Sequence, residues 1–312
     1  MKTTKYKLMS LVLVMGFTFQ MLEAANPEPV NMLSTAHFTV LAGAGIDFKG
    51  SVNSTTNVGD IGTFPTTTIT GLENVVLIGT NHAGDAVTQN AKIDLVTAYN
   101  DATGRLASVS YGPIVDLKGL TLTNGVYYEP SSLGITETLT LDAQGNPNAV
   151  WIFQVGSTLT MESGSKVALT NGAQARNVFW TVGSSATLKT TSSFKGTILA
   201  KVSITMETGS TMEGRALAQT GAVTIDRISG ILPMPEAPRF THIYRSPNDA
   251  MTVILNTTPH FLLTLETCPD LILTNWVPIA TNIPVTSPWV YTDSAVLNVA
   301  TQRFYRAFIS LY

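Results

Sequence analysis

The chain has 312 residues, only 12% of which are charged, and its formal net charge is −3. It lacks the basic stripe that would neutralise phosphates, so nucleic acid binding is not expected. Cys268 is the only cysteine, which excludes an intrachain disulfide. We expect this cysteine to be a small buried apolar residue.

The N-terminus has the pattern of a secretory signal peptide. Lys2, Lys5 and Lys7 precede a mostly apolar stretch at 8–22, and two alanines follow at 24–25. Such a pattern predicts cleavage and export of the remaining chain. No later segment reaches the roughly 18 apolar residues that a membrane helix needs, so no membrane span is expected.

The next segments predict short strands and then a helix. Short stretches at 38–41 (FTVL), 58–61 (VGDI) and 75–78 (VVLI) predict strands. Residues 81–103 carry apolar residues at three- and four-residue spacing, which predicts an amphipathic helix that ends near Gly104. The expected apolar stripe consists of Ala83, Val87, Ala91, Leu95, Ala98 and Ala102.

Residues 105–231 repeat a phrase in which a threonine is flanked by two apolar residues. The copies are LTL at 139–141, LTM at 159–161, ATL at 186–188, ITM at 204–206 and VTI at 223–225. Because strand side chains alternate between faces, the apolar pair should point inward and the threonine outward. A repeat this short, with glycines between the strands, is typical of a coiled β-structure.

Two further sets of strands recur with this phrase. One set is apolar on both faces, so both of its faces should be covered; it comprises 150–153, 177–180, 197–200 and 215–218. The other set exposes charge through Lys166, Lys195 and Glu213. The three sets follow in a fixed order, which predicts a three-sided β-solenoid whose apolar side is covered by the helix.

The outward positions of the threonine strands should form two parallel files of small side chains. The predicted site consists of Thr138, Thr140, Thr158, Thr160, Ser185, Thr187, Ser203, Thr205, Ala222 and Thr224. The next outward places hold charged residues, namely Glu162, Lys189, Glu207 and Asp226. A threonine run at 66–70 (TTTIT) could extend one face, but the sequence does not place it.

The pattern changes after Ile231. Residues 232–239 are rich in proline, which is typical of a linker, and later period-two stretches predict a small all-β sandwich. The predicted division is a signal peptide at 1–25, a solenoid domain at 26–231, a linker at 232–239 and a C-terminal module at 240–312.

Several phrases resemble those of a known family. They include FTVLAG at 38–43, VGDIG at 58–62, HAGD at 82–85, LTLDAQG at 139–145, NVFW at 177–180 and GAVTID at 221–226. On these phrases, the segment from about 38 to 229 resembles the secreted ice-binding (antifreeze) proteins of bacteria, fungi and algae. The C-terminal segment is similar to a module at the ends of exported bacterial proteins, through 265–267, 275–276 and 303–306.

The resemblance implies a mainly β fold, a right-handed β-solenoid whose coils do not all follow sequence order. It also implies one long helix alongside and one flat face that binds ice. The expected partner is therefore an ice crystal surface. We expect no catalytic residue, no cofactor, no metal, and a monomeric, extracellular protein.

Two other functions are compatible with parts of the sequence. Solenoids also occur in polysaccharide-acting enzymes, but the carboxylates Asp47, Asp60, Asp116 and Asp142 are scattered and suit turns better than acid–base pairs. The four histidines show no metal-ligand spacing. An extracellular adhesive or structural role remains the other alternative, because threonine-rich strands also occur on ordinary solvated sheets.

Overall fold

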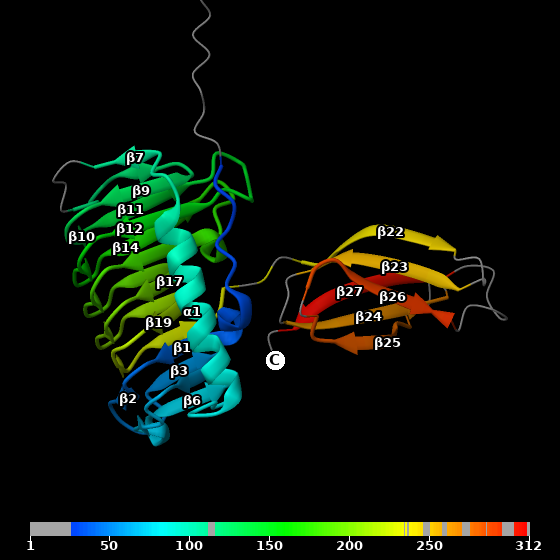
Figure 1. Ribbon diagram of the computed structural model, residues 1–312, viewed down its shortest axis with the longest axis horizontal. Helices are drawn as coiled ribbons and strands as arrows, with labels where there is room; N and C mark the ends of the chain where they lie inside the picture. The colour runs from blue at the N-terminus through cyan, green and yellow to red at the C-terminus, as the bar shows by residue number, and fades with distance from the viewer. Residues whose placement is uncertain are drawn as a thin grey trace, which may run out of the picture.

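The structure is a computed structural model that describes residues 26–111, 116–233, 235, 237–245, 250–257, 261–269, 275–284, 286–294 and 303–310. The predicted signal peptide lies outside the described residues. The described strands up to Ile231 wind into a three-sided solenoid, and the strands from Arg239 onward form two smaller sheets (Figure 1).

The side of the solenoid that carries the long helix is called the helix side. Its strands are β1 (Phe38–Ala42), β4 (Asp60–Thr63), β7 (Val109–Ser110), β9 (Gly125–Glu129), β12 (Trp151–Val155), β15 (Val178–Val182) and the second halves of β17 (Ser193–Ala200) and β19 (Thr211–Ala218). All pairings among them are parallel, as the predicted coil requires.

The side that carries the repeated threonines is called the threonine side. It is a seven-stranded parallel sheet with the spatial order β10 (Leu133–Ile135), β13 (Leu159–Met161), β16 (Ala186–Leu188), β18 (Ile204–Met206), β20 (Val223–Asp226), β2 (Ile46–Lys49) and β5 (Ile69–Thr70).

The remaining strands form the third side. They are β3 (Thr55–Val58), β6 (Val75–Ile78), β8 (Thr121–Leu122), β11 (Thr138–Asp142), β14 (Lys166–Thr170), β21 (Ser229–Ile231) and the first halves of β17 and β19. Three short 3₁₀ helices accompany the coils, η1 (Leu33–His37), η2 (Leu72–Asn74) and η3 (Ala175–Asn177).

Strands β17 and β19 turn from the third side to the helix side at paired glycines. Gly196 has a φ of +111° and lies opposite Gly214. A Cβ atom on Gly214 would lie 1.8 Å from the carbonyl oxygen of Gly196, so a side chain cannot be accommodated without moving backbone. Glycine at this corner therefore allows successive coils to stack closely.

The order of the coils along the solenoid differs from their order in the sequence. Strand β1 pairs with β19, with Val40 opposite Ala216, and β2 pairs with β20. Residues 38–78 thus form the last two coils of the stack, and helix α1 (Ala86–Gly104) runs back along the solenoid to β7 at the other end (Figure 1). The discontinuous order implied by the resemblance is confirmed.

Helix α1 begins five residues later than predicted. Asn81 forms a parallel bridge with Ile61, so residues 81–84 continue the last coil instead of the helix. Asp85 is the N-cap, because its side chain accepts a hydrogen bond from the Thr88 amide at 2.9 Å. Ala83 therefore precedes the helix, and Val87 is exposed, which corrects two members of the predicted stripe.

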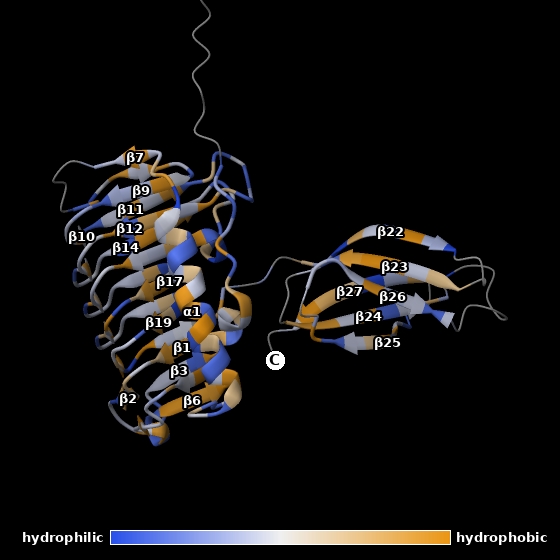
Figure 2. Ribbon diagram, viewed as in Figure 1, coloured by the Kyte–Doolittle hydropathy of each residue, from blue (hydrophilic) through white to orange (hydrophobic). Residues whose placement is uncertain are grey.

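The buried stripe of α1 packs on the helix side. It consists of Thr88, Ala91, Leu95, Ala98, Tyr99 and Ala102. Its apolar members share a core cluster with Leu41, Ile152, Phe179, Leu199 and Leu217 from successive strands. Figure 2 shows apolar residues recurring from coil to coil on the strands beside α1. The helix therefore covers the apolar outer face, as predicted.

An aromatic stack runs through the interior of the solenoid. It comprises Tyr111, Tyr127, Phe153, Trp180 and Phe194. The rings of Phe153 and Trp180 are stacked with centroids 3.9 Å apart, and both side chains are fully buried. Ring stacking therefore connects successive coils, in addition to the backbone hydrogen bonds between their strands.

We expect the phenol of Tyr127 to remain protonated in alkali. Burial raises the pKa of Tyr127 to about 12, whereas an unfolded tyrosine titrates near ~10. The native state therefore retains this proton at a pH where the unfolded chain loses it. The stabilisation from Tyr127 is complete below about pH 10 and is lost as the pH rises through 12.

An absorbance titration of the native protein and of Tyr127→Phe checks this expectation. The difference between the two curves should show a phenol that ionises about two pH units above free tyrosine. Ionisation of Tyr127 together with the exposed tyrosines would contradict it.

The C-terminal strands form two three-stranded antiparallel sheets. One contains β22 (Arg239–Arg245), β23 (Met251–Asn256) and β26 (Trp289–Asp293); the other contains β25 (Val277–Asn282), β24 (Leu262–Cys268) and β27 (Phe304–Ser310). Val253, Leu255, Leu263 and Leu265 form their common core. This is the predicted small β-sandwich, and Cys268 is buried within it.

Candidate functional site

The threonine side brings its outward residues into register. Thr160, Thr187, Thr205 and Thr224 lie directly opposite one another on consecutive strands. We call the row that contains them the first file; in spatial order it is Asp116, Gly134, Thr160, Thr187, Thr205, Thr224, Asp47 and Thr70. The residues on either side of each of the four threonines are buried, so the predicted inward and outward directions are confirmed.

A second file runs beside the first. Backbone hydrogen bonds place its members on successive coils; they are Ser132, Thr158, Ser185, Ser203, Ala222, Gly45 and Thr68. For example, the Leu159 amide donates to the Ser185 carbonyl at 3.2 Å. The Thr158 hydroxyl also donates to the Ser132 hydroxyl at 2.8 Å, so neighbouring coils are joined through side chains. Eight of the ten predicted site residues thus lie together on one sheet.

The other two predicted site residues, Thr138 and Thr140, do not lie there. Strand β11 belongs to the third side, where Thr138 lies opposite Lys166 and Thr140 opposite Ala168. The place next to Thr160 is taken by Gly134 of β10. The LTL phrase forms a strand, as predicted, but its predicted placement on the threonine side is wrong because β10 occupies that position in the coil.

The structure adds members that the sequence reasoning missed. Thr68 and Thr70, from the unplaced threonine run, lie on the last coil of the threonine side, and Asp47 and Gly45 lie on the coil before it. Their positions follow from the discontinuous coil order, which no local pattern reveals. Ser132 and Gly134 could have been found by applying the fixed order of strand sets to residues 125–142.

A charged row borders the first file. Its members are Glu162, Lys189, Glu207, Asp226 and Lys49. Lys189 contacts both carboxylate oxygens of Glu162 at 2.8 Å. Asp226 accepts a hydrogen bond from the Thr208 hydroxyl at 2.5 Å, and this bond lowers the pKa of the Asp226 carboxyl. These contacts hold long charged side chains along the border of the surface.

The other two sides of the solenoid are less regular. The helix side is covered by α1 and by the segment around η1. The third side carries exposed Lys166, the Lys195–Glu213 ion pair at 2.8 Å, and exposed Val76 and Ile78. The predicted exposure of charge on that side is confirmed. The third side also aligns four small hydroxyl residues, Ser193, Thr211, Ser229 and Thr56, but Lys166 and Val76 flank them in the same row. The helix side presents no such row to solvent, because α1 covers it.

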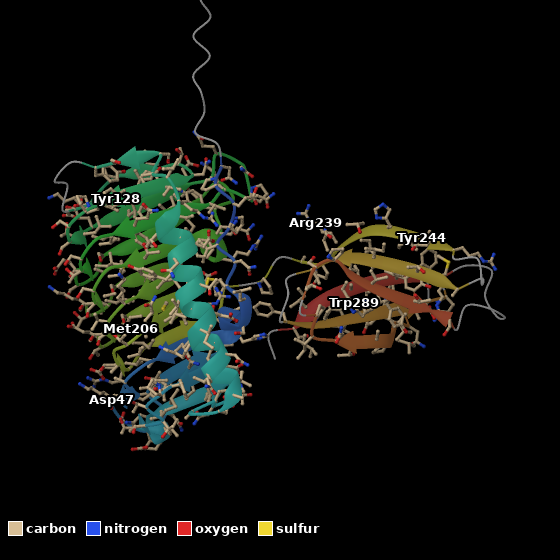
Figure 3. The ribbon with its side chains drawn as sticks, viewed as in Figure 1. Asp47, Tyr128, Met206, Arg239, Tyr244 and Trp289 are labelled. Atoms are coloured by element: carbon tan, nitrogen blue, oxygen red, sulfur yellow. The ribbon has the colours of Figure 1, made fainter. Side chains whose placement is uncertain are left out.

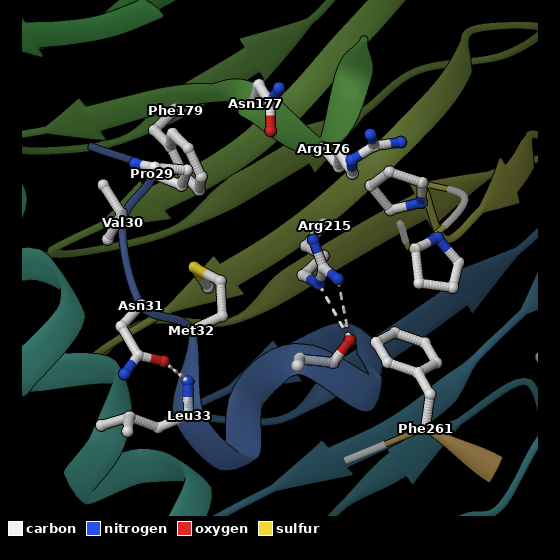
Figure 4. Close-up of a pocket in the computed structure, with 13 residues that line it drawn as sticks. Pro29, Val30, Asn31, Met32, Leu33, Arg176, Asn177, Phe179, Arg215 and Phe261 are labelled. Atoms are coloured by element: carbon white, nitrogen blue, oxygen red, sulfur yellow. Dashed lines mark hydrogen bonds between the residues drawn. The ribbon is translucent and has the colours of Figure 1, made fainter. Parts of the chain in front are cut away.

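A cavity of about 220 Å³ lies on the helix side near the N-terminal segment (Figure 4). Its lining includes Pro29, Val30, Met32, Arg176, Phe179, Arg215, Pro233 and Phe261. The buried guanidinium of Arg215 donates to the Ala36 carbonyl at 2.9 and 3.0 Å and to the Thr197 hydroxyl at 3.2 Å. These bonds tie η1 to the solenoid, so we interpret the cavity as part of a structural junction.

The described residues form neither a cluster of metal ligands nor a membrane-spanning helix. Among them, no group of three or more histidine, cysteine, aspartate or glutamate side chains could hold a metal ion. No helix in the same part of the chain is long and apolar enough to cross a bilayer. His82 contacts Asp85 at 2.7 Å and packs against Phe38, so it supports the start of α1.

Comparison with known sequences relates the solenoid to a described family. The family described as Ice-binding-like matches residues 40–229, which include every strand of the threonine side. An ice-binding protein of Nostoc sp. (strain HG1) is 44% identical over 204 residues, covering 65% of this chain and 74% of that protein. An ice-binding protein of Colwellia sp is 35% identical over 230 residues, covering 69% of this chain and 88% of that protein.

Solved structures show the same fold. The crystal structure of an ice binding protein from an Antarctic biological consortium is 44% identical, with a TM-score of 0.65, and covers 68% of this chain and 95% of that one. The crystal structure of the ice-binding protein of the Antarctic ascomycete Antarctomyces psychrotrophicus is 36% identical, with a TM-score of 0.63. The match covers 65% of this chain and 98% of that one.

Proposed function

Since the chain belongs to the Ice-binding-like family, we propose that it adsorbs to ice through its threonine side. The main observation in support of this proposal is the alignment of Thr160, Thr187, Thr205 and Thr224 on four adjacent parallel strands. The family consists of binding proteins, in agreement with the prediction that the chain is not an enzyme.

The proposal rests first on spacing. Ice offers neither a charge nor a pocket, so a protein that binds it needs many weak contacts at regular intervals. Parallel strands repeat at about 4.8 Å, and outward residues on one strand are about 6.7 Å apart. The first and second files therefore form a two-dimensional array, whose repeat is fixed by backbone hydrogen bonds and is not left to flexible side chains.

The chemistry of threonine supports the same conclusion. Its β-branched side chain is restricted to few rotamers, so each methyl and hydroxyl group is held in place. The hydroxyl can donate to and accept from water. Water molecules held between adjacent threonines can bridge the protein and the ice lattice, because bridging waters bind nearly as well as direct hydrogen bonds.

The rigidity of the sheet also contributes. The inward residues Leu159, Met161, Leu188, Ile204 and Met206 are fully buried beneath the threonine strands. A strand anchored on such a core cannot shift by a fraction of its repeat without opening a cavity. The surface therefore loses little conformational entropy on adsorption, which favours binding.

The cellular setting belongs to the same proposal. The N-terminal pattern supports export, and we propose that the mature chain acts outside the cell as a monomer that limits the growth or recrystallisation of ice. We keep the division into a solenoid domain at 26–231 and a C-terminal module at 240–312, joined by residues 232–239. The small sandwich is then an addition to the part that binds ice.

An ice-affinity partition of the mature protein tests the function. A slowly grown ice sample should become enriched in the protein relative to the remaining liquid, whereas a size-matched inert protein should be excluded. Shaping of single crystals into facets would give an independent readout. Retention in the liquid, with unfaceted growth, would contradict ice binding and favour an adhesive or structural role.

A further inference from the structure

The two files of the threonine side are both interrupted on the same coil. The coil of β2 contributes Gly45, which directly precedes the strand, to the second file and Asp47 to the first file, between threonine-containing coils on either side. This coil is also the seam where residues from the start of the chain stack on β20. Figure 3 shows Asp47 at the edge of the solenoid formed by the threonine side, near the end of the stack.

We propose that Asp47 limits the area of the ice-binding surface. This inference rests on the proposed function. On one side of Asp47 lie four consecutive threonines ending at Thr224, and on the other side lies Thr70. If residue 47 were a threonine, the first file would hold six in succession; with an aspartate there, Thr68 and Thr70 are separated from the main array.

The charge of Asp47 is the first reason. Its side chain is 43% exposed, and its nearest cation, the Nζ atom of Lys49, is 4.0 Å away. A carboxylate at that exposure keeps a tightly oriented hydration shell. An ice surface supplies no counter-charge, so bringing it against Asp47 requires removal of that shell without replacement.

The hydrogen bond of Asp47 is the second reason. The Thr70 hydroxyl donates to the Oδ1 atom of Asp47 at 2.7 Å. The proton of Thr70 is thus directed along the sheet and is not offered to water on the outer surface. Asp47 therefore removes two positions from the array, its own and that of Thr70.

The neighbouring charges reinforce the interruption. Lys49 lies opposite Asp226 on the border row, next to Asp47 on the same face of β2. At this seam, the charged border thus reaches into the first file. Elsewhere in that file, from Thr160 to Thr224, every position is a threonine.

Asp47→Thr tests the inference. At equal concentration, we expect about twofold greater freezing-point depression than the native chain, because additional weak contacts acting together strengthen adsorption. Asp47→Asn removes the charge but keeps an acceptor for the Thr70 hydroxyl, and it should give a smaller gain. Lys166→Thr, which replaces a charge by threonine on the third side, should leave the activity unchanged.

The outcomes separate this inference from the function on which it rests. Thr205→Tyr tests the binding surface itself, and its freezing-point depression is measured in the same assay as that of the Asp47 variants. Loss of activity in Thr205→Tyr with no gain in either Asp47 variant would overturn the inference and leave the proposed function intact. Full activity in Thr205→Tyr would overturn both. Unfolding temperatures of all variants confirm that folded proteins are compared, and Asp47→Asn decides the matter if Asp47→Thr is unstable.

Discussion

Replacing Thr205 with tyrosine is expected to abolish most ice binding while leaving the protein folded. Thr205 lies near the middle of the first file, between Thr187 and Thr224. A phenol ring there would project above the plane of the neighbouring hydroxyl and methyl groups and would separate several coils from the ice. We expect adsorption to weaken by at least about tenfold, which corresponds to ~1.4 kcal/mol.

The control for this substitution is Thr140→Tyr. Thr140 belongs to the same type of phrase and is also half-buried, but it lies on the third side opposite Thr121 and Ala168. The two variants introduce the same side chain on different sides of one solenoid. Freezing-point depression and ice-affinity partition should fall only for Thr205→Tyr. An equal loss in Thr140→Tyr would show that the third side takes part in binding.

Truncating Trp180 to alanine should cause the largest loss of stability. Its ring is fully buried, stacks on Phe153 at a centroid distance of 3.9 Å and contacts Phe194, and its indole nitrogen donates to the Lys195 carbonyl at 3.1 Å. A buried tryptophan-to-alanine change typically costs about 3–5 kcal/mol. Domains are stable by only about 5–15 kcal/mol, so the solenoid should become marginal.

Denaturant unfolding followed by circular dichroism measures this effect. Trp180→Phe keeps a stacked ring and should lose much less stability than Trp180→Ala. Ice binding at low temperature should fall only in proportion to the unfolded fraction, since Trp180 does not reach the threonine side. If Trp180→Ala unfolded at the same denaturant concentration as the unsubstituted protein, the role assigned to the aromatic stack would be contradicted.

Much of the fold was accessible from local patterns. The alternation around Thr160, Thr187 and Thr205 indicated which residues face the core, and the structure confirms those directions. The apolar stripe of α1 from Ala91 to Ala102 was likewise readable, because helical spacing is a local property. Patterns of this kind depend on residues a few positions apart, so no knowledge of distant contacts was needed.

The errors concern placement in three dimensions. Thr140 has an apolar neighbour on each side, as the site threonines do, yet its side of the solenoid depends on how many strands precede it in the coil. The sequence pattern predicts Asn81 in the helix, but its bridge to Ile61 keeps it in the last coil. Thr70 joins the threonine side only because β2 stacks on β20, which comes from much later in the chain. Such long-range pairings leave no local signature.

The return path of α1 constrains how this protein could change in size. The 19 residues of the helix lead from the last coil of the stack back to the first, so its length must match the height of the solenoid. Each coil adds about 4.8 Å, whereas each helical residue spans about 1.5 Å, so one extra coil requires about three extra residues of helix. The length of the helix thus limits the number of coils. A larger binding area can be gained more simply by substituting surface residues than by inserting a repeat.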